Sequence, residues 1–161
     1  MTPVSDVGRP RPTLSVVIPA FNEAGRLGRT LAHTRAVLQA APWPVEVLVV
    51  VDGSTDGTAA LVAAAAREGG PVPIRLLAEP ANRGKGYCVR RGMLEASGDV
   101  RLFCDADLAT PIEEVIPFTE AVRSGDDIVI ASRRAVGAEL RHRQPWLRAL
   151  LGTVFSAVVG R

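Results

Sequence analysis

Two carboxylates stand one residue apart in the stretch Leu102-Phe-Cys-Asp-Ala-Asp-Leu-Ala-Thr-Pro111, where an apolar run ends at Asp105 and Asp107. A buried strand that delivers both side chains to its exposed carboxyl end concentrates negative charge there. Period-two alternation puts the two side chains on the same side of that strand. The charge becomes favourable once a divalent cation and a diphosphate bind, because hard cations take carboxylate and phosphate oxygens as ligands. The alternative is that one acid caps a helix beginning near Pro111 and the other is merely solvated.

Polar residues also follow two earlier apolar runs. Pro19-Ala-Phe-Asn-Glu23 comes after the first, where Pro19 is expected to stop a strand and Asn22 to cap a helix. Asp52-Gly-Ser-Thr-Asp-Gly57 comes after the second. A carboxylate at a strand end, such as Asp52, can accept hydrogen bonds from a base or a ribose hydroxyl. A turn with its helix cap would explain either segment equally well.

Basic residues follow two further apolar runs. Asn82-Arg-Gly-Lys-Gly86 opens a predicted helix with glycines on both sides of Lys85, and a helix N-terminus with nearby cations suits phosphate. The spacing is not that of a P-loop. Ser132-Arg-Arg134 adds two guanidinium groups that can contact diphosphate oxygens bidentately. A short surface loop would often carry such residues, so their place beside the other strand ends gives them weight.

The elements that must position these residues alternate along the chain. Short β-branched runs predict buried strands, and longer segments rich in Ala, Leu, Arg and Glu predict helices. Strict alternation favours an α/β fold with a mainly parallel sheet covered by helices on both faces, and ligands bind such sheets outside the carboxyl ends of the strands. The predicted strands are Leu14–Ile18, Val45–Val51, Ile74–Leu77, Val100–Cys104 and Ile128–Ala131, and the predicted helices are Glu23–Gln39, Thr58–Arg67, Gly84–Ala96 and Ile112–Arg123.

Composition bounds the possibilities. The chain has 161 residues, of which 47% are hydrophobic, which is enough for one domain with a continuous core. A net charge of +2 gives no support for an extended nucleic-acid surface, so no nucleic-acid partner is expected. The two cysteines, Cys88 and Cys104, are expected to be buried thiols rather than a disulfide, as suits a reducing cytosol.

The two ends of the chain differ in character. Residues 1–13 are rich in proline and charge and are expected to form a disordered leader. Residues 141–161 are expected to form an amphipathic helix, in which Arg141, Arg143 and Arg148 flank Trp146 and precede an apolar stretch too short to span a bilayer. Such a helix suits an anionic membrane surface, and a core helix or a homodimer contact is the equally weighted alternative.

The motifs, taken in order, resemble those of family 2 inverting glycosyltransferases of the GT-A fold. The matching segments are Val16-Val-Ile-Pro-Ala-Phe-Asn-Glu23, Val51-Asp-Gly-Ser-Thr-Asp-Gly57, Asn82-Arg-Gly-Lys-Gly86, Asp105-Ala-Asp-Leu-Ala-Thr-Pro111 and Ser132-Arg133. The residues of these motifs are most similar to those of the polyprenyl-phosphate glycosyltransferases, in particular the dolichyl-phosphate β-glucosyltransferase branch. The resemblance to dolichyl-phosphate mannose synthases is looser. The resemblance to the family as a whole implies a GT-A, Rossmann-like catalytic domain that binds a nucleotide-sugar over residues 14–140.

The resemblance also implies roles for individual residues, here by their numbers in this chain. The nucleotide pocket is bordered by Pro19, Asn22 and Glu23, and the base or ribose contacts Asp52. The pyrophosphate lies near Arg83 and Lys85, and its phosphates are steadied by Arg133. The catalytic Asp-x-Asp motif is Asp105 and Asp107, which hold Mg²⁺ or Mn²⁺, with Asp107 the favoured direct ligand. Two departures matter: Val51-Asp52 replaces a pair of acids common in the family, and the chain stops at Arg161, which suggests a truncated form.

The expected activity follows from this resemblance. A hexose, with glucose favoured, passes from UDP-glucose or GDP-mannose to a polyprenyl or dolichyl phosphate with inversion and metal assistance, at the cytoplasmic face of a membrane. A lipid phosphate is already ionised near neutral pH, so no general base is required. The alternatives are a family 2 transferase with another donor or a soluble acceptor, and a donor-binding fragment without turnover. A nucleotidyltransferase is disfavoured because Pro19-Ala-Phe-Asn-Glu23 is not its glycine-rich loop.

Overall fold

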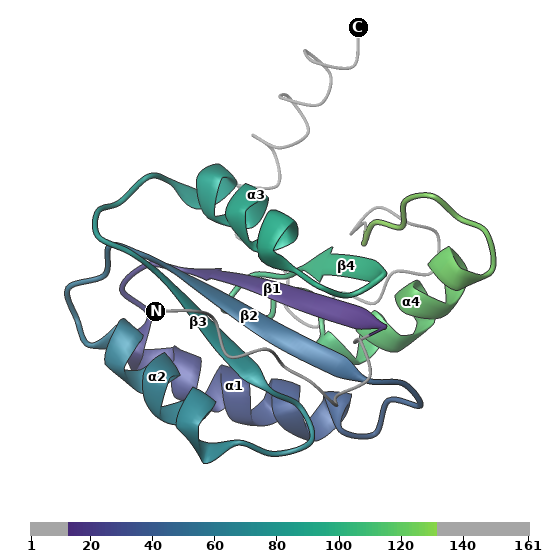
Figure 1. Cartoon of the computed structure of the whole chain (residues 1–161), viewed down its shortest axis with the longest axis horizontal. Helices are drawn as coiled ribbons and strands as arrows, with labels where there is room; N and C mark the ends of the chain where they lie inside the picture. The colour runs from purple at the N-terminus through teal and green to yellow at the C-terminus, as the bar shows by residue number, and fades with distance from the viewer. Residues whose placement is uncertain (1–12, 132–161) are drawn as a thin grey trace, which may run out of the picture. The chain divides into compact units, whose positions relative to one another are not determined.

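A computed structural model of the protein describes residues 13–131, in which strands and helices alternate along the chain (Figure 1). Polar turn residues and glycines separate β-branched runs from alanine-rich and leucine-rich segments, so each element has the propensity of its type. In order, the elements are β1 (Leu14–Ala20), α1 (Ala24–Leu38), β2 (Val45–Asp52), α2 (Thr58–Glu68), β3 (Ile74–Glu79), α3 (Lys85–Glu95), β4 (Val100–Phe103), the 3₁₀ turn η1 (Ile112–Glu114) and α4 (Val115–Arg123).

The four strands form one parallel sheet in the order β3-β2-β1-β4. Strand β1 pairs with β2 from Leu14 opposite Val45 to Ala20 opposite Val51. Its pairing with β4 is shorter and ends with Val17 opposite Phe103. The chain therefore builds the sheet outward from β1 to β3 and then returns to the other side of β1. This reversal makes the carboxyl end of β1 a topological switch point, where α/β sheets bind their ligands.

Helices cover both faces of the sheet, as the sequence predicted. Helices α1 and α2 lie on one face and α3 lies on the other (Figure 1). Alternate residues of β2 divide between the two sides: Val47 and Val49 belong to the larger core cluster with α1 and α2, whereas Leu48 and Val50 pack with Cys88 of α3. Burial on both faces explains why the strands read as continuous apolar runs.

Helix α3 lies close to the sheet because of Gly92. A Cβ atom at this position would stand 2.3 Å from Cγ1 of Val17 and 3.1 Å from Cγ2 of Val50. Only glycine leaves room for that approach. The close packing fixes the helix whose first residue, Lys85, borders the site described below.

The predicted strand Ile128–Ala131 is wrong. These residues have no regular structure, and the side chains of Ile128 and Ile130 are 82% and 78% exposed. Alternating β-branched residues favour a strand, but a strand also needs a neighbour to pair with, and β4 forms only the four-residue edge of the sheet. The compact unit that contains the sheet extends to Val129.

Several expectations concern residues that are not described. The predicted leader and C-terminal amphipathic helix fall on residues 1–12 and 132–161, apart from Thr13, and stay predictions. The end of the predicted domain at residue 140 lies there too. Within residues 13–131, no helix combines the length and the apolar character needed to cross a membrane.

Candidate functional site

A pocket opens at the carboxyl edge of the sheet because β4 is shorter than β1. Strand β4 ends at Phe103, whereas β1 continues past Val17, so Pro19 has no strand beside it on that side. Proline lacks the N–H that a neighbouring strand would require, which explains how it fits within a central strand. The sequence predicted that Pro19 would stop β1, but the strand extends one residue further, to Ala20.

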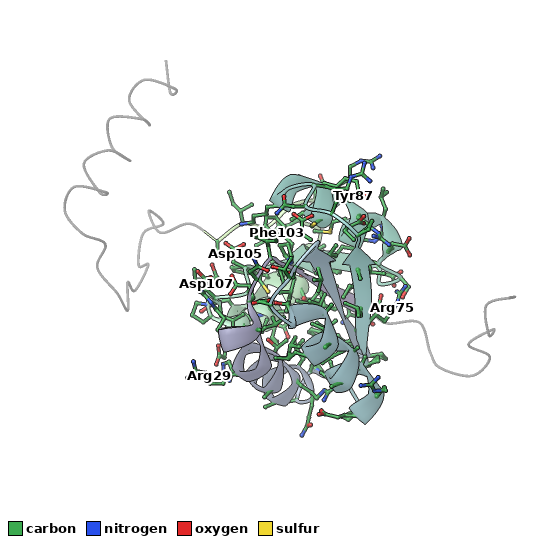
Figure 2. All side chains as sticks on the ribbon, turned by 90° about the vertical axis from the view of Figure 1, so that its left-hand side faces the viewer. Arg29, Arg75, Tyr87, Phe103, Asp105 and Asp107 are labelled. Atoms are coloured by element: carbon green, nitrogen blue, oxygen red, sulfur yellow. The ribbon has the colours of Figure 1, made fainter. Side chains whose placement is uncertain are left out.

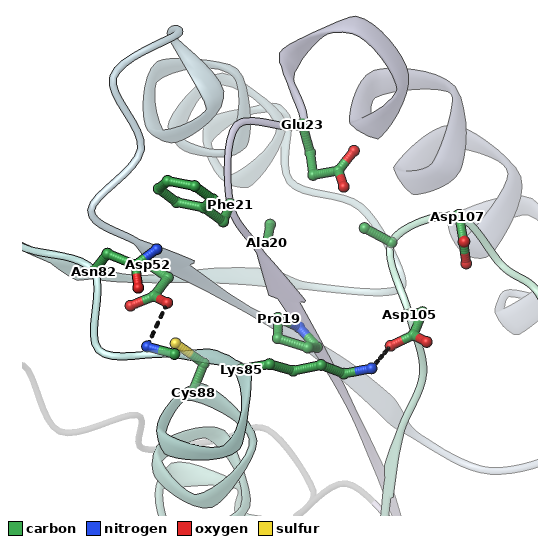
Figure 3. A pocket seen from close by; sticks show the side chains of 12 residues that line it. Pro19, Ala20, Phe21, Glu23, Asp52, Asn82, Lys85, Cys88, Asp105 and Asp107 are labelled. Carbon is green, nitrogen blue, oxygen red and sulfur yellow. Dashed lines mark hydrogen bonds and ion pairs between the residues drawn. The ribbon is translucent and has the colours of Figure 1, made fainter. Parts of the chain in front are cut away.

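The pocket has a volume of about 360 Å³, enough for much of a nucleoside diphosphate (Figure 3). It contains four carboxylates and one ammonium group, so its charge is strongly negative. Its lining residues are Pro19, Ala20, Phe21, Glu23, Asp52, Asn82, Gly84, Lys85, Cys88, Asp105, Ala106 and Asp107. The structure thus brings together six of the predicted site residues: Pro19, Glu23, Asp52, Lys85, Asp105 and Asp107.

The carboxylate of Asp52 holds the loop before α3. Its Oδ1 accepts the backbone N–H of Arg83 at 2.7 Å, and its Oδ2 accepts that of Gly84 at 2.9 Å. The loop also lies directly on Gly53, where φ is +63° and a Cβ atom would stand 2.5 Å from the carbonyl carbon of Ala81. Asp52 is 4% exposed, so both oxygens act mainly within the protein. Asp52 was predicted to contact a base or ribose. In the structure it lies beneath the loop before α3 and binds the backbone of that loop.

Lys85 and Arg83 point to different places. The Nζ atom of Lys85 forms an ion pair with Oδ1 of Asp105 across the pocket (Figure 3). The guanidinium of Arg83 instead lies over the ring of Tyr87, 4.2 Å from its centroid, and donates a hydrogen bond to the Tyr87 hydroxyl at 3.0 Å. Tyr87 lies apart from Asp105 and Asp107 in Figure 2. Arg83 does not line the pocket, so of these two cations, both predicted to lie near the pyrophosphate, Lys85 reaches it and Arg83 does not.

The two acids of the Asp-x-Asp motif lie on a turn rather than on a strand. The N–H of Leu108 donates to the carbonyl of Asp105 at 3.0 Å, and the N–H of Ala109 donates to Oδ1 of Asp107 at 3.0 Å. Strand alternation therefore does not place the two side chains, contrary to the sequence prediction. Both acids nevertheless line the pocket, with Ala106 between them.

The loop containing Asn22 is tied to the loop after β2. The side-chain oxygen of Asn22 accepts the backbone N–H of Thr55 at 3.0 Å. The backbone N–H of Asn22 donates to the Ser54 hydroxyl at 3.0 Å. The prediction that Asn22 caps α1 is wrong, since the N–H of Ala24 at the start of α1 donates instead to Oδ2 of Asp56. Asn22 does not line the pocket.

Asp56 joins the starts of two helices. Its Oδ2 accepts the N–H of Ala24 at 3.0 Å, and its Oδ1 accepts the N–H of Thr58 at 3.1 Å as well as the Thr58 hydroxyl. The Thr58 hydroxyl has the largest effect on the pKa of Asp56, and together with these N–H groups it outweighs burial and holds that pKa below its ordinary value. The β1–α1 and β2–α2 loops therefore form one connected wall beside the pocket.

Burial makes both cysteine thiols weak acids. Burial, and next the nearby Asp52, raise the pKa of Cys88 to about 11. Burial, together with the charges of Asp105 and Asp107, raises the pKa of Cys104 to about 12. Both thiols are free; Cys88 is buried, as predicted, whereas Cys104 lies just after β4 and is only partly buried. Neither group is a nucleophile near neutral pH.

The donor set fits a divalent cation held jointly with a ligand. Asp105 and Asp107 offer hard carboxylate oxygens at the pocket, which suit Mg²⁺ or Mn²⁺. Within the described part of the chain, no group of three or more His, Cys, Asp or Glu side chains could hold a metal ion without further ligands. A cation here would have to complete its coordination with ligand oxygens or water, as Mg²⁺ commonly does with substrate phosphates.

Sequence reasoning missed Phe21, Asn82 and Cys88 among the pocket residues. Phe21 is 47% exposed and lines the pocket, and Figure 3 shows it at the end of β1. An aromatic residue directly after a strand end was the available signal for Phe21. Cys88 carried no signal, because a buried apolar position on α3 looks the same whether or not a pocket lies beside it. Arg133, which was predicted to steady the phosphates, lies outside the described residues.

His33 lies away from the pocket. It is on α1, and its Nε2 is 3.2 Å from Oε1 of Glu113 in η1. Neither residue lines the pocket.

Comparison with known proteins identifies the family. The sequence profile described as Glycosyl transferase family 2 matches residues 15–155. A dolichyl-phosphate beta-glucosyltransferase from Trichomonas vaginalis is 38% identical over 154 residues, which cover 89% of this chain and 45% of that protein. An undecaprenyl-phosphate 4-deoxy-4-formamido-L-arabinose transferase from Serratia proteamaculans is 32% identical, covering 92% of this chain and 43% of the relative. The chain thus spans less than half the length of these curated relatives.

Solved structures give the same result for the fold. A mannosyltransferase from Pyrobaculum calidifontis, in complex with GDP-Man and Mn²⁺, superposes with a TM-score of 0.58 at 28% identity, covering 73% of this chain and 33% of that one. A glucosyl-3-phosphoglycerate synthase from Mycobacterium tuberculosis, with Mn²⁺, UDP and glucosyl-3-phosphoglycerate, has a TM-score of 0.53 at 27% identity, covering 72% and 41%. These matches confirm the GT-A type of α/β fold. On its motifs, its sheet and its relatives, the chain belongs to glycosyl transferase family 2.

Proposed function

We propose that this chain is a glycosyltransferase that moves a hexose from a nucleotide-sugar to a polyprenyl or dolichyl phosphate, with inversion. The observation that carries the proposal is the acidic pocket at the switch point, where Asp105, Asp107 and Lys85 meet. The names of the relatives support a lipid-phosphate acceptor, since both a dolichyl-phosphate and an undecaprenyl-phosphate transferase align over most of this chain.

The charge of the pocket argues for a metal-assisted donor complex. A diphosphate is itself an anion, and a pocket with four carboxylates and one ammonium would repel it. Asp105 and Asp107 would hold Mg²⁺ or Mn²⁺ together with the diphosphate. A bound divalent ion would neutralise the departing nucleoside diphosphate. Mn²⁺ in the structures of two structural neighbours supports the use of a divalent ion.

Different residues of this chain would bind different parts of the donor. The start of α3 presents backbone N–H groups and the ammonium of Lys85, which suit the diphosphate. Asp52 keeps this segment in place through its bonds to Arg83 and Gly84. The exposed ring of Phe21 offers a flat apolar surface for a base. Arg133 is proposed to contact the phosphates.

The acceptor side requires little acid–base chemistry from the chain. A phosphate monoester oxygen is ionised near neutral pH and can attack the anomeric carbon directly, from the face opposite the leaving diphosphate, which inverts that carbon. The described pocket residues include no histidine, in keeping with such an acceptor. We also propose that residues 141–161 bring the protein to the cytoplasmic face of a membrane, where a lipid phosphate is available.

Glucose from UDP-glucose is the favoured donor group, on the wording of the motifs and on the first relative. GDP-mannose is the alternative, because a GDP-Man complex is among the structural neighbours. Isothermal titration with UDP-glucose and with GDP-mannose, each with and without Mn²⁺, tests donor and metal together. Donor binding that needs Mn²⁺, and is lost in Asp107→Ala but kept in Asp99→Asn, is the expected result. Unchanged affinity of Asp107→Ala in Mn²⁺ would contradict the metal assignment.

Transfer itself is tested by incubating the protein with radiolabelled nucleotide-sugar and polyprenyl phosphate. Label in the lipid phase supports the proposal. A soluble acceptor is the second candidate, because the synthase from Mycobacterium tuberculosis was solved with glucosyl-3-phosphoglycerate. Label in a soluble phosphorylated product would favour that candidate. Tight donor binding without transfer to either acceptor would identify the chain as a donor-binding fragment, which its partial coverage of its relatives makes a real alternative.

A further inference from the structure

The turn that carries the two acids is attached to α1 by one side chain. The hydroxyl of Thr30 donates a hydrogen bond to the carbonyl oxygen of Ala106 at 2.8 Å, between residues 76 positions apart in the sequence. Both residues are buried, with Thr30 8% and Ala106 5% exposed. Ala106 stands between Asp105 and Asp107, so this bond holds the peptide that connects the two acids.

A helical threonine usually uses its hydroxyl within its own helix. Thr119 of α4 does so and donates to the carbonyl of Val115, four residues earlier, at 2.7 Å. The hydroxyl of Thr30 is directed to a distant turn instead. Among the described residues, it is the donor found for the buried carbonyl of Ala106. Removing it would leave a buried acceptor without a partner, which is unfavourable.

The turn needs such an attachment because its conformation is strained. Leu108 has a φ of +50°, which a branched side chain rarely adopts. The other hydrogen bonds of the turn, from Leu108 to Asp105 and from Ala109 to Asp107, are local and move with it. The bond from Thr30 is different, because it fixes the turn to α1, which packs into the core through Leu27 and Leu31.

We infer that Thr30 is a positioning residue for the acid pair: it orients the Asp105–Asp107 turn so that both carboxylates face the cation and the diphosphate. The inference rests on the proposed function, since it assigns Thr30 a role toward the metal that these acids are proposed to hold. Outer residues that orient metal ligands change metal affinity by about 10- to 100-fold when they are lost. Thr30 acts through a backbone carbonyl, so we expect about tenfold.

The experiment compares the Mn²⁺ affinity of four proteins, measured by titrating the Mn²⁺ electron paramagnetic resonance signal at saturating UDP or GDP, whichever the wild-type protein binds. Thr30→Val removes the hydroxyl and keeps the shape, and Thr30→Ser keeps the hydroxyl. Thr34→Val is the matched control, because Thr34 lies one turn further along α1, is 1% exposed, and has no hydrogen-bond partner for its hydroxyl among the described residues.

We expect Thr30→Val to weaken Mn²⁺ binding about tenfold, Thr30→Ser to retain near wild-type affinity, and Thr34→Val to have no effect. Equal Mn²⁺ affinity in Thr30→Val and wild type would overturn the inference, as would an equal loss in Thr34→Val. If thermal unfolding shows that Thr30→Val does not fold, Thr30→Ala replaces it with the same expectations. A wild-type protein that binds no Mn²⁺ with either nucleotide would overturn the proposed function itself, which separates the two failures.

Discussion

Oδ2 of Asp52 accepts the backbone N–H of Gly84 at 2.9 Å and so joins the end of β2 to the segment that begins α3. The other carboxylate oxygen accepts the N–H of Arg83. Asp52 therefore shapes the phosphate side of the pocket from below. Asp52 was expected to contact a nucleotide, but it also holds the segment before α3 in place whether or not a ligand is bound.

Asp52→Asn should loosen this segment. The amide retains one acceptor oxygen, but its NH₂ group would face a backbone N–H, so one of two buried bonds is lost. Because a hydrogen bond to a charged group contributes about 1.5–3 kcal/mol, we expect affinity for a nucleoside diphosphate to fall about tenfold or more. Hydrogen exchange at the amides of Arg83 and Gly84 should become faster.

Asp99→Asn is the control for this change, because it removes the same charge from an exposed position before β4. It should alter neither exchange nor affinity. Unchanged protection of Arg83 and Gly84 in Asp52→Asn would show that the two bonds do not hold the segment.

Lys85→Met and Arg83→Met should separate the two cations. Only Lys85 lines the pocket, whereas Arg83 is engaged with Tyr87. We expect Lys85→Met to weaken UDP binding about tenfold while leaving uridine binding nearly unchanged, since the partner of the ammonium is the diphosphate. Arg83→Met should have little effect on either ligand. Calorimetry with both ligands is the measurement, and equal losses for UDP and uridine in Lys85→Met would contradict the assignment.

The thiols of Cys88 and Cys104 should resist alkylation in the folded protein. With pKa values raised to about 11 and about 12, about one thiol in a thousand or fewer is ionised at pH 8. Mass spectrometry after iodoacetamide at pH 8 should find both cysteines unmodified, and both should react fully in 6–8 M urea, roughly the range that unfolds small domains. Rapid labelling of Cys88 under native conditions would mean that the base of the pocket opens to solvent.

Much of the fold could be predicted because strands buried on both faces read as unbroken β-branched runs, as β2 does. Parallel pairing then brings the residues after each strand to one edge, which is why Asp52, Lys85 and Asp105 meet. The segment Ile128–Ala131 has the same local pattern but no paired neighbour, and local pattern carries no information on pairing.

Side-chain partners were harder to predict than elements. Asn22 is a residue type typical of helix caps. The N–H of Ala24 at the start of α1 is instead bound by Asp56, which is distant in sequence. Lys85 was expected to lie near a pyrophosphate, and its ion pair with Asp105 was not predicted. The hydroxyl of Thr30 could not be found from sequence at all, because a threonine on the inner face of a helix normally bonds within that helix. Each of these outcomes depends on tertiary contacts.

Glu46 provides a test at the other end of the sheet. It is the second residue of β2 and its side chain is 6% exposed. Oε1 accepts the Ser15 hydroxyl at 2.6 Å and both the N–H and the hydroxyl of Ser97, at 2.8 Å and 2.7 Å. Oε2 lies 3.3 Å from a guanidinium nitrogen of Arg75. Burial raises the pKa of this carboxyl, but the hydrogen bonds together outweigh burial and hold the pKa below its ordinary value.

A lowered folded-state pKa fixes the sign of the pH dependence. The unfolded chain binds a proton at Glu46 more readily than the folded chain, so the ionised carboxyl stabilises the fold fully above the ordinary glutamate pKa of about 4.3. That contribution is lost as the pH falls through the lower folded-state value. Glu46→Gln should therefore reduce the free energy of unfolding at pH 7 by about 2 kcal/mol, the range for a hydrogen bond to a charged group.

Urea unfolding of both proteins between pH 7 and about pH 3 measures this effect, since the range spans the ordinary glutamate pKa. The difference in free energy between wild type and Glu46→Gln should shrink toward low pH, because the wild-type carboxyl becomes neutral as well. Glu95→Gln is the matched control: its carboxylate also faces Arg75, at 3.8 Å, but is 50% exposed. It should change stability by about 0.5 kcal/mol or less at every pH. A Glu46→Gln difference that stays constant across this range would mean that shape, and not charge, makes Glu46 stabilising.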